Sequence, residues 1–95
     1  MPAYMIVQIK VTDAEKFAAY RAAVPSVVES FGGRYLVRGG AVEVLEGAHD
    51  GRRVVVFEFP SAEAIRRFWN SPEYAKVKPL RTNAAEVDAW IVPAA

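Results

Sequence analysis

Apolar residues occupy every second position near the start of the chain, which predicts a β-strand over residues 4–11. One face of this strand is wholly apolar and consists of Met5, Val7, Ile9 and Val11. The spacing of apolar residues then changes to three and four, which is typical of one face of a helix. This stripe consists of Phe17, Tyr20, Val24, Val27 or Val28, and Phe31.

Polar and conformationally special residues set the limits of this first helix. Thr12 or Asp13 can cap its first turn. Gly32-Gly33 is expected to end it, because glycine readily adopts the left-handed conformation found at helix C-termini. Pro25 has no amide proton and is expected to kink or split the helix near its middle.

The second predicted strand runs from residue 34 to residue 46 in two pieces. The pieces are residues 35–37 and 42–45, on either side of Gly39-Gly40. Paired glycines within a strand pattern indicate a β-bulge or a sharp bend.

A turn over residues 47–51 follows, in which Asp50-Gly51 is a hairpin signal. The third predicted strand covers residues 53–59 and is apolar on both faces except at Glu58. A carboxylate alone on an apolar strand makes Glu58 a further candidate for a functional residue.

Two short helices and a last strand complete the chain. Ser61 is expected to cap the first of these helices, and Pro72 can occupy the first position of the next. The last strand is predicted over residues 86–92.

The predicted order is β-α-β-β-α-β. Right-handed crossovers then place both helices on one face of an antiparallel sheet, with the spatial order strand four, one, three, two. This is the ferredoxin-like arrangement of the α+β class. No repeat or linker interrupts it, so we expect one domain over residues 1–95.

The second face of this sheet is too apolar to meet water alone. The apolar residues on that face are Tyr4, Ile6, Val54, Val56, Trp90 and Val92. A sheet that is apolar on both sides needs a second layer. The simplest layer is an identical chain in a two-fold homodimer. The alternative is a monomer with scattered apolar surface residues.

Composition narrows the class of protein. Of the 95 residues, 53% are hydrophobic and 24% are charged, which excludes a disordered chain. The absence of cysteine excludes a disulfide scaffold, and the short apolar stretches exclude a membrane span. A net charge of +1 predicts no binding to nucleic acid or to a membrane surface. Because residues 1–3 lack the basic start of a secretion signal, we expect a cytoplasmic protein.

Four segments together resemble a known family. They are residues 20–25 (YRAAVP), 32–40 (GGRYLVRGG), 42–47 (VEVLEG), and 71–74 with 78–81 (SPEY and KPLR). In this combination and order they resemble the domain-of-unknown-function family numbered 1330. The resemblance implies a ferredoxin-like protomer whose sheets pair into a dimeric α/β barrel. It implies no reaction, because the family has no agreed activity and its superfamily ranges from cofactor-free monooxygenases to haem-degrading enzymes.

The best candidate site combines charged and aromatic side chains: Tyr20, Arg38, Glu46, Tyr74 and Arg81. Arg38 or Arg81 can hold a carboxylate or an enolate, since a guanidinium group matches planar oxyanions. Tyr20 or Tyr74 can donate a proton or a hydrogen bond, and Glu46 can act as a base once buried. The structural alternative makes the tyrosines core residues, pairs Arg38 with Glu46, and leaves Arg81 on a solvated face.

Other chemistry has little support in the sequence. His49 is the only histidine and lies in the predicted turn, where we expect an exposed side chain. One histidine, no cysteine and dispersed carboxylates make no metal-binding pattern, and no glycine pair matches a phosphate loop. We therefore expect neither a metal ion nor an organic cofactor.

Two functions remain, and whether the chain is an enzyme is left open. The first is a dimer that binds, and in its stronger form converts, a small aromatic or carbonyl metabolite without a cofactor. The second is a non-catalytic dimerisation or stress-associated module. A cavity in the range of small-molecule sites, ~300–1,000 Å³, would favour the first function, and a filled core would favour the second.

Overall fold

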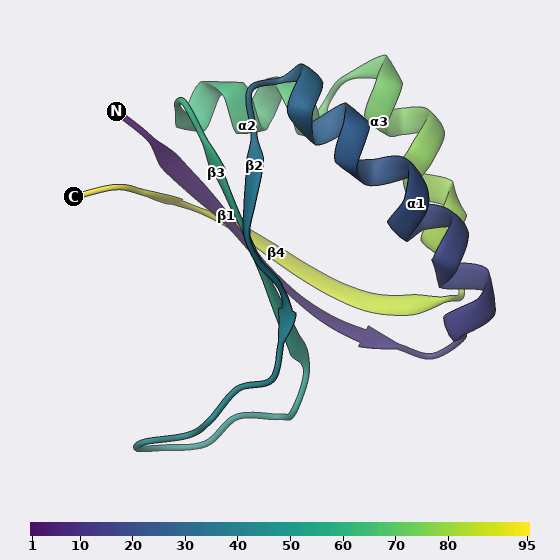
Figure 1. Ribbon diagram of the computed structural model, residues 1–95, viewed down its shortest axis with the longest axis vertical. Coiled ribbons are helices and arrows are strands. Elements are labelled where there is room, and N and C mark those ends of the chain that lie inside the picture. The colour runs from purple at the N-terminus through teal and green to yellow at the C-terminus, as the bar shows by residue number, and fades with distance from the viewer.

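Four strands, three α-helices and one short 3₁₀ helix make up the computed structural model, which describes all residues from 1 to 95. They are β1 (Ala3–Val11), α1 (Ala14–Ser30), β2 (Arg34–Gly40), β3 (Arg53–Phe59), α2 (Ala62–Trp69), α3 (Pro72–Val77), the 3₁₀ helix η1 (Lys78–Arg81) and β4 (Ala85–Pro93). All the helices lie on the same side of the sheet (Figure 1). None of them combines the length and the hydropathy of a bilayer-spanning segment.

The strands form one antiparallel sheet in the order β2-β3-β1-β4, which confirms the predicted ferredoxin-like topology. Ile6 on β1 lies between Val56 on β3 and Trp90 on β4. Side chains alternate across a strand, so these three residues share the face that carries no helix. We call it the open face.

Helix α1 begins and ends where its local chemistry predicts. The Lys16 amide donates to Oδ1 of Asp13 at 3.0 Å, which caps the first turn. Gly32 has φ +82°, and the Gly33 amide reaches back to the Val28 carbonyl at 3.0 Å. The helix is continuous through Pro25, so the predicted split is wrong.

The two helices after β3 are capped by serines. Ser61 accepts a hydrogen bond from the Ala64 amide, and Ser71 accepts one from the Tyr74 amide, both at 3.0 Å. Pro72 occupies the first turn of α3, as predicted. This short helix carries Tyr74 into the core, where the side chain is almost fully buried.

The core lies between the sheet and the helices. Its members come from β1, β3 and all three α-helices: Ala3, Met5, Val7, Val24, Val28, Val55, Phe57, Phe59, Ala64, Ile65, Phe68 and Tyr74. At Gly33 the backbone packs so closely on β3 that an added Cβ would lie 2.6 Å from the Phe59 ring. The open face contributes no member, because nothing covers it within one chain.

The prediction that the second strand continues over residues 42–45 is wrong. Strand β2 ends at Gly40 after a register shift between Arg38 and Gly40, and residues 41–52 form an irregular connection. The predicted bulge is therefore present, but residues 42–45 have no strand to pair with. In the register of β2 and β3 the residues that would face them are 49–52, which include Asp50 and Gly51, a glycine with positive φ, and these disfavour a strand.

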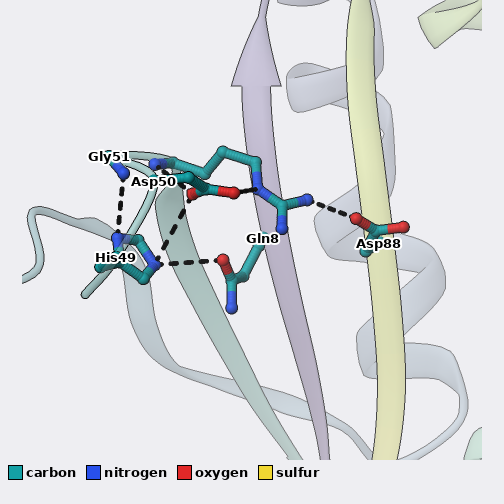
Figure 2. A network of polar contacts seen from close by, with 6 residues as sticks. Gln8, His49, Asp50, Gly51 and Asp88 are labelled. Atoms are coloured by element: carbon teal, nitrogen blue, oxygen red, sulfur yellow. Dashed lines mark hydrogen bonds and ion pairs between the residues drawn. The ribbon is translucent and has the colours of Figure 1, made fainter. Parts of the chain in front are cut away.

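A network of polar contacts ties the end of this connection to the open face (Figure 2). His49 bonds through Nε2 to Oε1 of Gln8 on β1 at 3.1 Å, and its Nδ1 accepts from the Gly51 amide. Arg52 pairs with Asp50 at 2.8 Å and with Asp88 on β4. Only 18% of the His49 side chain is exposed, so the predicted exposed histidine is wrong. The side chain is not left in water, because Gln8 on β1 bonds to it.

Candidate functional site

A cavity of about 440 Å³ lies on the helix-covered side of the sheet. Strands β1, β3 and β4 form its floor, and α1 closes it from above with Phe17, Tyr20 and Val24. Phe68, Trp69 and Tyr74 close one end. The volume falls within the range of small-molecule sites, ~300–1,000 Å³.

Aromatic side chains form part of the lining, together with aliphatic ones. The Trp69 ring lies 5.1 Å from Tyr74, and the Phe68 ring lies 4.7 Å from the same residue, measured between centroids. On the β2 side, Tyr35 and Phe57 have centroids 4.4 Å apart. Paired rings of this kind bury large areas and favour aromatic guests in offset or edge-on geometry.

Two tyrosine hydroxyls meet at this cavity. Tyr20 on α1 and Tyr74 on α3 have their hydroxyl oxygens 2.8 Å apart. Burial raises the pKa of Tyr20 far above its usual range, Tyr74 adds to the rise, and the positive charge of Arg81 opposes it. The phenol therefore stays protonated at physiological pH. Since one proton serves the bond between the two oxygens, the pair keeps one O–H group that can donate to a ligand.

Arg38 and Arg81 occupy different positions around these tyrosines. Arg38 lines the cavity, with its guanidinium carbon 4.0 Å from the centroid of the Tyr35 ring. Arg81 lies on η1 outside the lining, 5.7 Å from the centroid of the Tyr20 ring. Its Nε is buried and has no hydrogen-bond partner.

The structure does not bring Glu46 to this site. Glu46 lies in the exposed connection between β2 and β3, and it forms no ion pair with Arg38. No aspartate, glutamate or histidine lines the cavity. The proposed role of Glu46 as a base therefore has no geometric support, whereas Tyr20, Tyr74 and Arg38 all line the cavity.

The other polar side-chain clusters do not form a second candidate site. Glu58 lies on the open face and pairs with Arg34 at 2.8 Å. No three histidine, cysteine, aspartate or glutamate side chains lie close enough together to hold a metal ion.

A family model, the domain of unknown function DUF1330, matches residues 2–95. The chain belongs to the DUF1330 family. The segments that first suggested this family include Tyr20 and Arg38, both of which line the cavity, and Arg81 beside Tyr20. None of the curated proteins matches the chain in sequence.

Several solved structures share the fold of this DUF1330 protein. A protein of unknown function from Rhodopseudomonas palustris is 22% identical, with a TM-score of 0.76 over 99% of this chain and 82% of its own. SnoaB from Streptomyces nogalater, a cofactor-independent oxygenase, is 15% identical, with a TM-score of 0.63 over 99% and 93%. A dimeric ferredoxin-like protein of unknown function from Jannaschia is 8% identical, with a TM-score of 0.65 over 99% and 100%. At these identities the likeness concerns the fold alone.

Two cavity residues of the DUF1330 chain were missed by the sequence prediction. Arg53 begins β3 on the same face as Val55, so strand alternation alone could have placed it on the helix side. Arg21 lies four residues after Phe17 and stacks 5.3 Å from its ring centroid, a spacing that brings side chains together on a helix.

Proposed function

We propose that this DUF1330 protein binds a small aromatic carbonyl compound in the cavity under α1, without a metal or organic cofactor. The observation that carries the proposal is the combination of apolar and aromatic lining with one pair of partly buried hydroxyls. Small-molecule sites commonly have this composition, with a few polar groups that fix the orientation of an apolar ligand.

The tyrosine pair supplies the polar anchor in this proposal. The ligand's ring packs among Phe68, Trp69 and Tyr35, and its carbonyl oxygen accepts the free proton of the Tyr20–Tyr74 pair. A hydrogen bond in such a desolvated place polarises the carbonyl and stabilises negative charge that develops on its oxygen. The cofactor-independent oxygenase SnoaB supports the proposal to the extent that a similar fold serves such an enzyme.

Tyr74→Phe and Tyr20→Phe are expected to weaken binding of acetylnaphthalene by about 2–10-fold, because the hydroxyl that remains is no longer held in position by its partner. Ethylnaphthalene, which lacks the carbonyl oxygen, should bind both variants and the parent protein equally. Fluorescence or NMR titration measures both ligands, and Tyr4→Phe on the open face is the matched control. An equal loss for both ligands, or a loss in the control, would contradict the proposed anchor.

The open face favours a second function, association with an identical chain. It carries Ile6, Val54, Val56, Trp90 and Val92, with polar side chains towards its ends. About half of Trp90 is exposed, and a large aromatic residue exposed within an apolar patch is typical of a protein–protein interface. We propose a two-fold homodimer through this face, and two ferredoxin-like relatives of unknown function described as dimeric support it. A non-catalytic dimerisation or stress-associated module would need only this face and would leave the cavity without a ligand.

A further inference from the structure

The cavity is lined by positive charge with no negative charge to balance it. Arg21, Arg38 and Arg53 are the charged residues of its lining. They come from α1, β2 and β3, three elements that bound the cavity. No carboxylate belongs to the lining, although the whole chain has eleven acidic residues against twelve basic ones.

These three arginines also lack ion-pair partners elsewhere. The arginines in ion pairs are different ones: Arg34 with Glu58, Arg52 with Asp50 and Asp88, and Arg67 with Glu63. Arg38 and Arg21 stack on the Tyr35 and Phe17 rings instead. When a guanidinium group stacks on an aromatic ring, the flat face of the guanidinium contacts the ring. The N–H groups at the edge of the guanidinium are then free to donate.

The backbone of β2 leaves room beside two of these side chains. Gly39 has φ +81° at the register shift and lies against Arg53, whose Cβ is 4.0 Å from where a Cβ of Gly39 would be. Arg38 is its direct neighbour in the chain. A residue without a side chain therefore adjoins both arginines, which line the cavity and remain exposed to solvent.

We propose that the natural ligand is an anion: an aromatic carbonyl compound that also carries a carboxylate. Its ring lies in the apolar cavity with its carbonyl oxygen at the tyrosine pair, and its carboxylate is bound by Arg38 and Arg53, with Arg21 facing it from α1. This inference rests on the proposed function and adds the charge of the ligand to it. A planar carboxylate accepts two parallel N–H bonds from one guanidinium group, and such charge-assisted bonds are about twice as strong as neutral ones. Burying the ring supplies affinity, and the arginines select the acid over its neutral analogues.

The test compares naphthoate with naphthamide, which have the same ring system and differ in charge. We expect the parent protein to bind naphthoate about tenfold more tightly than naphthamide at neutral pH. Arg38→Met and Arg53→Met should each reduce that preference, and the double variant should bring the two affinities close to equality. Arg34→Met is the matched control, since it removes the same charge from β2 but lies in an ion pair outside the cavity. Thermal melting of each variant without ligand shows that it remains folded.

The possible outcomes separate this inference from the proposed function. Equal binding of naphthoate and naphthamide would overturn the inference and leave an uncharged aromatic site. The same would follow if Arg34→Met reduced the preference as much as Arg38→Met, because the effect would then come from net charge. Failure of both compounds to bind at millimolar concentration would overturn the proposed function and the inference with it.

Discussion

Phe68→Ala is expected to lower the free energy of unfolding by about 3–5 kcal/mol, the usual cost of truncating a buried phenylalanine. The Phe68 side chain is only 1% exposed, and its ring meets those of Phe59 and Tyr74 at 5.6 and 4.7 Å. It also closes one end of the cavity. The substitution should therefore enlarge the cavity into the core and weaken ligand binding.

Urea denaturation at equilibrium measures this loss. Arg66→Ala is the control, because it lies on the same helix α2 but is exposed, and it should change stability by less than about 0.5 kcal/mol. If the variant is too unstable to study, Phe68→Leu keeps most of the volume and should lose clearly less. A loss at Phe68→Ala no greater than at Arg66→Ala would contradict the packing described for this end of the cavity.

Trp90→Glu is expected to convert the proposed homodimer into a folded monomer. Trp90 lies beside Ile6 on the open face and is 46% exposed in one chain, so a glutamate costs the monomer little. In a sheet-to-sheet dimer that same carboxylate would be buried against apolar side chains without a partner, which costs several kcal/mol. The dimer dissociation constant should rise by at least about a hundredfold.

Sedimentation velocity over a concentration series measures this change. Leu80→Glu is the matched control, because Leu80 is similarly exposed at 38% but lies on η1, away from the open face. The control should remain dimeric, and circular dichroism should show both variants folded. A parent protein that sediments as a monomer at micromolar concentration would contradict the dimer directly.

Most of the fold could be predicted because its signals are local. Asp13 and Ser61 cap the helices that follow them, an alternating pattern identifies β1, and a short apolar run identifies β3. The right-handedness of the crossovers then places the helices on one face of the sheet without any knowledge of contacts.

What could not be predicted depends on partners distant in the sequence. Residues 42–45 alternate like a strand, but the chain opposite them forms no ladder. His49 is held by Gln8, a residue 41 positions away, through a side-chain bond that no turn pattern indicates.

In the candidate site, too, the sequence predicts single residues but not the contacts between residues that are distant in the chain. Tyr20 and Tyr74 were chosen as separate polar residues on predicted helices, and the structure joins their hydroxyls across 54 positions. Glu46 was expected at the end of the second strand. That strand already ends at Gly40, so Glu46 lies outside the cavity. The pattern of apolar residues does not indicate Arg53, because it is a charged residue at the first position of a strand.

Nuclear Overhauser effects between the ring protons of bound naphthoate and the valine methyl groups test the central claim most directly. Adjacent valines on β3 point to opposite faces, so the measurement separates the cavity from the open face within one strand. We predict contacts to Val7, Val24 and Val55, which line the cavity. Contacts confined to Val54 and Val56 would place the ligand on the open face and contradict the account.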